Sequence, residues 1–151
     1  MKKTILPLIL FFALARFSYA EDSIVISDAW VREVPPGTSV SAVYMTIENK
    51  GGQYDKLISM SSDVAESTEL HMSKVDENGV ATMEMIKILD LPGGEAVEFK
   101  PGGMHIMLIG LKESLVGKDR VKLNLNFEKS GVVKVEVPVK STKNSGSGHH
   151  H

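Results

Sequence analysis

The sequence predicts an all-β fold, a β-sandwich or a small Greek-key barrel, from three observations. Residues 121–127 and 133–139 alternate strictly between apolar and polar side chains, which is typical of a strand with one buried face. Short segments rich in strand-forming residues recur between turn signals along the rest of the chain. No stretch keeps a helical apolar period over three turns. Eight or nine short strands at this spacing favour a sandwich or barrel over other architectures.

Glycine, proline and asparagine mark where each predicted strand ends. In chain order, strands are expected at 24–33, 40–49, 54–60, 66–75, 80–88, 95–99, 104–110, 121–127 and 133–139. The turn signals between them include Pro35-Pro36-Gly37, Lys50-Gly51-Gly52, Asn78-Gly79, Pro92-Gly93-Gly94 and Pro101-Gly102-Gly103. Trp30 and Tyr44, on the first two strands, are expected to pack in the core.

The two ends of the chain are expected to lie outside the domain. Residues 1–20 combine an early pair of lysines, a short apolar run and small residues before Ala20, as export signals do. The apolar run is shorter than the ~20 residues that span a bilayer. Cleavage after Ala20 would leave a soluble domain at 21–143. Residues 144–151 resemble a linker and a partial His tag, so the three terminal histidines are set aside.

Composition excludes several classes of function. The 151-residue chain has no cysteine, so it can use neither a disulfide nor a thiolate nucleophile. It has 17 basic and 19 acidic residues, and loss of Lys2, Lys3 and Arg16 with the signal leaves 14 basic residues and a formal charge of -5. No basic cluster points to nucleic acid or to a membrane surface. No phosphate loop, Gly-x-Ser-x-Gly elbow or His-Glu-x-x-His helix is present, so we expect no enzyme.

Both histidines outside the terminal run lie beside methionines. His105 and Met107 are two residues apart on one predicted strand, so their side chains leave the same face about 6–7 Å apart. Met104 should then point inward to the core. The other histidine, His71, lies in the segment 70–85 with three of the eight methionines of the chain.

The register of the hairpin around Asn78-Gly79 decides which of those side chains meet. A two-residue turn would pair Met72 with Met85 and place His71 on the other face. A three-residue loop at 77–79, with Gly79 in the left-handed conformation, would place His71 opposite Met85 and diagonal to Met83. The sequence leaves both registers open, since a slip of one residue turns every side chain to the other face. Only the second register builds a site.

If the two clusters converge, their chemistry favours Cu(I). Imidazole and thioether are neutral, and thioethers are soft ligands that suit Cu(I) better than zinc, calcium or magnesium. A blue-copper electron carrier needs a cysteine, which is absent. The competing interpretation is that each methionine only fills the core of an exported β-sandwich that binds no metal.

The spacing of these residues resembles the signature of a known family. His71-Met72, ten residues, Met83, twenty-one residues and His105-x-Met107 are similar to the H(M)x10Mx21HxM motif of the PCuAC periplasmic copper chaperones. The segments "AWVREVPPG", "AVYMTIENKGG", "ELHM", "PGGMHIMLIGLK" and "VKLNLNFEKSG" extend the likeness from Ile24 to Val139. The resemblance implies a cupredoxin-like fold and one Cu(I) per chain. Its ligands would be His71, Met83, His105 and Met107. Met72 matches an optional position, and Met85 could replace or supplement Met83.

The resemblance also implies a role. A PCuAC chaperone works in the periplasm and passes copper to apo cytochrome c oxidase, at the dinuclear copper site of subunit II, alongside Sco-type thiol proteins. We expect a monomer that enters no membrane. A periplasmic copper buffer or resistance protein would carry the same residues, so the sequence does not separate a chaperone from a buffer.

Overall fold

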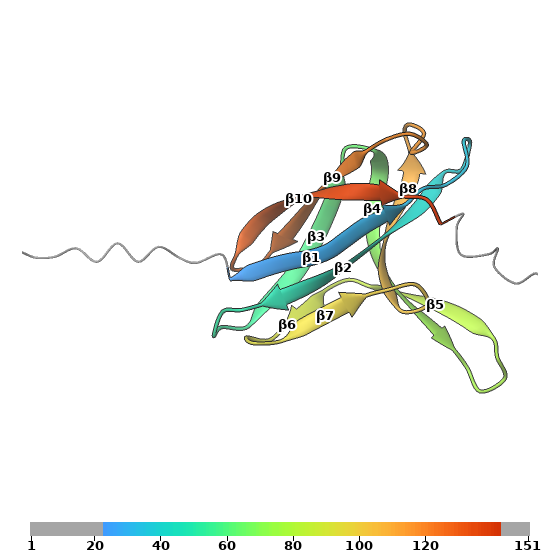
Figure 1. Cartoon of the computed structure of the whole chain (residues 1–151). Coiled ribbons are helices and arrows are strands. Elements are labelled where there is room, and N and C mark those ends of the chain that lie inside the picture. The colour runs from blue at the N-terminus through green and yellow to red at the C-terminus, as the bar shows by residue number, and fades with distance from the viewer. Residues whose placement is uncertain (1–22, 143–151) are drawn as a thin grey trace, which may run out of the picture.

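The computed structural model describes residues 23–142, which form one all-β unit. The expected signal peptide at 1–20 and the linker and tag at 144–151 lie outside the described residues. Ten strands are present: β1 (Ile24–Arg32), β2 (Val40–Asn49), β3 (Asp55–Ser62), β4 (Ala65–Val75), β5 (Ala81–Ile86), β6 (Leu89–Leu91), β7 (Ala96–Phe99), β8 (Met104–Leu111), β9 (Arg120–Phe127) and β10 (Gly131–Lys140) (Figure 1). Residues 23–142 contain no helix that is long and apolar enough to span a membrane.

All nine predicted strands are confirmed, and one strand was missed. The missed strand, β6, has three residues, and only Leu89 and Leu91 are buried. An alternation this short cannot be told from a turn in sequence. Predicted strand ends differ from the observed ones by up to two residues, and β5 ends at Ile86 rather than at 88.

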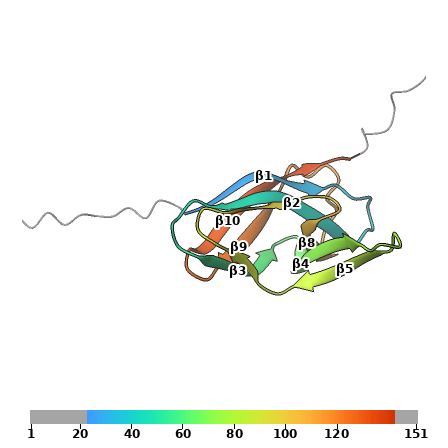
Figure 2. The same ribbon diagram turned by 90° about the horizontal axis from the view of Figure 1, so that it is seen from below.

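The strands form one hydrogen-bonded path that folds into two layers (Figures 1 and 2). Its order is β5-β4-β8-β2-β1-β10-β9-β3-β6, and β7 pairs with the second half of β2. The layers join where β1 and β10 run parallel. The path is open at β5 and β6, so the predicted sandwich is found rather than a closed barrel.

The core lies between the two layers and consists of apolar side chains from both. The layer with β4, β8 and β2 contributes Leu70, Ile106, Leu108 and Val43, and the other contributes residues such as Leu125. Alternation along each strand leaves the second face of each layer free of core packing. The free face of the first layer is the one that carries both histidines.

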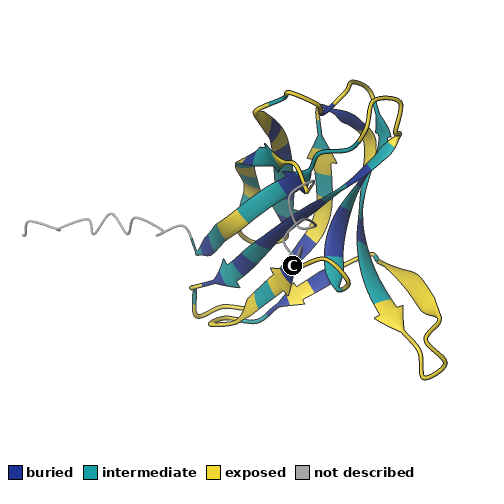
Figure 3. Cartoon of the chain, turned by 45° about the vertical axis from the view of Figure 1, so that its right-hand side comes forward, coloured by how far each residue is buried: buried dark blue, intermediate teal, exposed yellow. Residues whose placement is uncertain are grey.

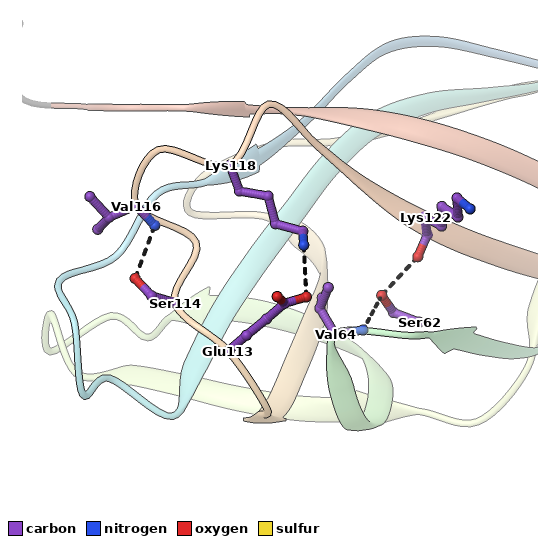
Figure 4. Close-up of polar contacts among 7 residues, drawn as sticks. All are labelled: Ser62, Val64, Glu113, Ser114, Val116, Lys118 and Lys122. Atoms are coloured by element: carbon purple, nitrogen blue, oxygen red, sulfur yellow. Dashed lines mark hydrogen bonds and ion pairs between the residues drawn. The ribbon is translucent and has the colours of Figure 1, made fainter.

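The loop between β8 and β9 inserts one more apolar side chain into this core. Leu115 is fully buried there. Two contacts within the loop hold its shape: Lys118 Nζ lies 2.7 Å from Glu113 Oε1, and the Val116 amide donates to Ser114 Oγ at 3.2 Å (Figure 4). The long connection is therefore ordered by its own side chains.

A buried carboxylate ties β3 to the turn between β9 and β10. Asp55 accepts hydrogen bonds from the amides of Lys56, Lys129 and Ser130 and from the Ser130 hydroxyl, at 2.6 to 3.0 Å. Burial alone would raise the pKa of the Asp55 carboxyl, but the four hydrogen bonds outweigh it, so this pKa is lowered from its usual range. A cysteine-free chain thus has an electrostatic clamp between distant segments.

We expect Asp55→Asn to lower the free energy of unfolding by about 1–3 kcal/mol at neutral pH, because the amide NH₂ would face donors. A lowered carboxyl pKa stabilises the fold above the unfolded value of about 3.9, and this contribution is lost as the pH falls through the folded value. Urea unfolding from neutral to acidic pH should show the difference shrinking below about pH 4. Asp63→Asn, at an exposed position, is the control. A difference independent of pH would contradict the clamp.

Candidate metal centre

The hairpin of β4 and β5 adopts the three-residue loop. His71 pairs with Met85, and Ser73 pairs with Met83. Gly79 has a φ of 78°, the left-handed conformation that this loop requires. The Asp76 carboxylate accepts the amides of Asn78 and Val80 at 2.9 and 2.8 Å, which favours this loop over a two-residue turn. Of the two predicted registers, the one that builds a site is therefore present.

Pairing of β4 with β8 brings the two histidines together. His71 lies directly opposite His105, and their ring centroids are 6.1 Å apart. Glu69 lies opposite Met107 one step along the same face. His71 is therefore flanked by His105 on one neighbouring strand and by Met85 on the other.

Hydrogen bonds select the nitrogen that each ring leaves free. His105 Nδ1 is 2.9 Å from the Gly103 carbonyl, which can only accept, so Nδ1 carries the proton and the Nε2 lone pair is free. His71 Nε2 is 2.7 Å from Glu69 Oε2, so Nε2 donates and the Nδ1 lone pair is free. Partners of this kind orient imidazole ligands in metal sites.

The free nitrogen of His71 is buried and has no hydrogen-bond partner in the described structure. An unpaired buried nitrogen costs free energy, and such atoms are uncommon in native proteins. A metal ion at Nδ1 would remove that cost. This orphaned atom is the structural sign that the residues present fit a bound ion.

A cleft of about 320 Å³ lies beside the histidine pair and contains three of the four predicted ligands. Met83, His105 and Met107 line it, together with Tyr44 and Arg32. His71 stands next to His105 at the side of this cleft. The structure therefore brings all four predicted residues to one region of one face.

The remaining methionines separate into two groups. Met85 lies opposite His71 but does not line the cleft, and its side chain is half exposed. Met72 pairs with Met104, and both lie on the strand face opposite to that of the histidines. Met104 packs against the core, as predicted. Met85 is thus within the neighbourhood of the site, whereas Met72 is directed away from it.

Residues 23–142 contain no cluster of side chains that would suit a harder ion such as zinc, calcium or magnesium. No set of three or more histidine, aspartate or glutamate side chains gathers there. Glu69, a carboxylate close to the histidines, is already bonded to His71. The donors of the site are two imidazoles and neutral sulfur.

Three neighbours of the site were not predicted from the sequence. The Tyr44 ring lies 6.4 Å from that of His105, Trp30 lies 4.6 Å from Tyr44, and the Arg32 guanidinium lies 5.6 Å above Tyr44. The expectation that Trp30 and Tyr44 pack in the main core is wrong: Tyr44 is buried on the histidine face, and Trp30 is only half-buried. A bulge in β1, where Asp28 has a φ of 52°, shifts the register and places Trp30 opposite Tyr44. Only pairing over three strands reveals this group.

Comparison with known proteins finds relatives described as proposed lipoproteins and, among solved structures, copper-bound domains. The family model described as LpqE-like, for proposed lipoproteins, matches residues 24–139. A protein of Leifsonia xyli subsp. xyli, also named as a proposed lipoprotein, is 33% identical over 120 residues, 79% of this chain and 70% of the relative. An uncharacterized protein of Rickettsia prowazekii is 31% identical over 113 residues, 72% of this chain and 62% of its own length.

Solved structures with the same fold include copper-bound domains. The copper-bound PCuAC domain from PmoF2 is 25% identical, with a TM-score of 0.67 over 82% of this chain and 97% of that domain. The solution structure of CuI-DR1885 from Deinococcus radiodurans is 30% identical, with a TM-score of 0.64 over 86% of each chain.

We expect the two histidines to adopt opposite tautomers in the metal-free protein. Long-range proton–nitrogen NMR correlation at a pH where both rings are neutral should find the proton on Nε2 of His71 and on Nδ1 of His105. Glu69→Ala removes the acceptor for His71 and should mix its tautomers, while His105 stays unchanged. The same tautomer in both rings, or no response of His71, would contradict the hydrogen-bond assignment.

Proposed function

The chain belongs to the LpqE-like family, and we propose that it binds one Cu(I) through His71, Met83, His105 and Met107 and hands it to an acceptor protein. The resemblance to the PCuAC family is confirmed, since the chain matches solved PCuAC structures over most of their length. The copper-bound state of two of those structures supports copper as the metal. The proposal assigns no catalysis to the chain.

The observation that carries this proposal is that two imidazoles, each with a free nitrogen, lie side by side, and one of them shares a cleft with two thioethers. The unpartnered Nδ1 of His71 lies beside His105, and His105 shares a cleft with Met83 and Met107. All four donors are uncharged. Cu(I) is the common biological ion that prefers such a soft, neutral set.

The exposure of the donors suits transfer by ligand exchange. His105 is 7% exposed, whereas Met83 is 55% exposed on β5, which projects from the sandwich and is exposed along nearly its whole length (Figure 3). The histidines would therefore hold the ion from within while an acceptor approaches from the side of Met83. An incoming ligand would form its bond to copper as the Met83 sulfur leaves. Copper stays Cu(I) throughout.

The proposed acceptor is apo cytochrome c oxidase, at the dinuclear copper site of subunit II, with Sco-type thiol proteins as further partners. Thiolate sulfur holds Cu(I) more strongly than thioether sulfur because it adds a charge to the same soft donor. Transfer of Cu(I) to such a site would therefore lower the free energy and need no energy source. The export signal expected at 1–20 and the lipoprotein description of the family support the periplasm as the place of action.

A copper buffer remains the second candidate. A buffer would use the same four donors but would need no exposed ligand for a partner to replace. The exposure of Met83 favours hand-over, and a test for transfer to purified apo subunit II separates the two functions. Retention of copper in the presence of that acceptor would favour the buffer.

Titration of the tag-free mature protein with Cu(I) under anaerobic, reducing conditions should give one tight equivalent against a chromophoric chelator. His105→Ala, Met83→Leu and Met107→Leu should each weaken binding at least about tenfold, the size of effect that even outer partners of metal ligands produce. Met85→Leu should have less effect because Met85 lies outside the cleft.

Met72→Leu is the matched control for that titration, since Met72 neighbours His71 but faces away from it. Methionine-to-leucine changes nearly conserve volume, so the fold should survive them. An affinity that falls equally in Met72→Leu, or no binding above background by the wild type, would contradict the site.

The affinity for Cu(I) should fall as the pH is lowered from about 7 to about 5, because a protonated imidazole cannot bind the ion. Competition titrations across this range measure the effect. The His71→Ala variant should show a shallower dependence, since one of the two competing protonations is gone. An affinity that is flat over the range would argue against histidine ligation.

A further inference from the structure

Arg32 is the one charged side chain among those lining the cleft with His105 and Met107. Its Nε atom is buried and has no hydrogen-bond partner in the described structure. No carboxylate within residues 23–142 lies close enough to form an ion pair with it. A half-buried guanidinium without a counter-ion therefore faces the proposed copper site.

Strand pairing directs Arg32 toward this cleft. Val31 pairs with Val43 on β2, and Ala42 pairs with Met107 on β8. Arg32 and Met107 therefore flank Ala42, whose small side chain leaves the space between them open. The Arg32 backbone is fixed independently, since it pairs with Lys140 and its carbonyl accepts the Ser41 hydroxyl at 2.6 Å.

The charge of Arg32 is unfavourable for a resident cation. Two imidazoles and two thioethers cannot neutralise Cu(I), so the loaded site would place two positive charges in one cleft. The unpaired Nε adds a desolvation cost of its own. An anion that enters the cleft beside the guanidinium would offset the excess positive charge. Glu69 lies on the His71 side and is bonded to that ring, so the cleft wall that carries Arg32 has no negative partner until an anionic ligand arrives.

Resting on the proposed function, we propose that Arg32 receives the incoming thiolate of the acceptor during copper transfer. A thiolate suits both neighbours because its sulfur binds Cu(I) and accepts hydrogen bonds from the guanidinium. A carboxylate would suit only the guanidinium, since Cu(I) disfavours hard oxygen. The thiolate donates an electron pair to Cu(I) as a methionine sulfur withdraws its own. No electron or proton is transferred, and Arg32 acts as a positioning residue.

Acceptors that differ in charge can test this role. Protein loaded with one Cu(I) is mixed rapidly and anaerobically with dithiothreitol at about pH 8, where part of the dithiol is thiolate. Transfer is followed by the ultraviolet thiolate-to-Cu(I) absorption. A parallel reaction uses neocuproine, a neutral chelator whose Cu(I) complex is coloured. Each rate is measured for the wild type, Arg32→Met, Arg32→Lys and the control Arg120→Met, which removes an exposed arginine from the other layer.

We expect Arg32→Met to slow transfer to the dithiol roughly tenfold, as the loss of one nearby positive charge predicts. Transfer to neocuproine should change less than about twofold, because that acceptor carries no charge. Arg32→Lys should restore part of the dithiol rate, since it keeps the charge but lacks the planar fork. Added salt should narrow the difference between wild type and Arg32→Met.

Equal slowing with both acceptors would assign Arg32 a structural role and overturn the inference. If Arg32→Met still loads copper and its rate of transfer to the dithiol is unchanged, the inference about Arg32 is overturned and the proposed function stands. Failure of the wild type to take up Cu(I) would overturn the function and the inference together.

Discussion

Pairing between β4 and β8 is the constraint on which the rest of this molecule depends. The register that places His71 opposite His105 also directs Leu70 and Ile106 into the core on the other face. A slip of one residue would bury both histidines and expose the core side chains, so hydrophobic packing selects the register that builds the site. The free energy that holds the proposed ligands in place is thus the same free energy that folds the sandwich.

Hydrogen bonds then fix the orientation of the two imidazoles and the ring nitrogen that each leaves free. The carbonyl of Gly103 accepts hydrogen bonds from His105 Nδ1 and, at 3.1 Å, from the Ser73 amide, so one backbone group orients a proposed ligand and ties β4 to the turn before β8. Glu69 holds the other ring from within its own strand. Each imidazole is therefore oriented before any ion binds, which reduces the entropy lost on binding. The thioethers differ, since Met83 sits on an edge strand with few neighbours.

Charge is distributed unevenly around this neutral donor set. Glu69 lies beside His71 and is hydrogen-bonded to its ring. Arg32 lies above Tyr44 and forms no ion pair with any carboxylate within residues 23–142. The unpaired charge of Arg32 would make the cleft hold a cation less tightly than an uncharged side chain at this position would. An open cleft with an unpaired positive charge on its wall supports the proposed hand-over of copper more than storage.

Local sequence determined nine of the ten described strands, the turns and the identity of the proposed donors, because alternation, glycine and proline act over a few residues. It also determined that His105 and Met107 share a face. The pattern of residues left two hairpin registers open, and the local hydrogen bonds of the Asp76 carboxylate favour the one observed. Tertiary structure alone decided that β4 pairs with β8 and so places His71 opposite His105. It alone assembled Trp30, Arg32 and Tyr44 beside His105, through a bulge in β1 and pairing across three strands. These features depend on contacts between segments far apart in the chain, and no short-range pattern specifies them.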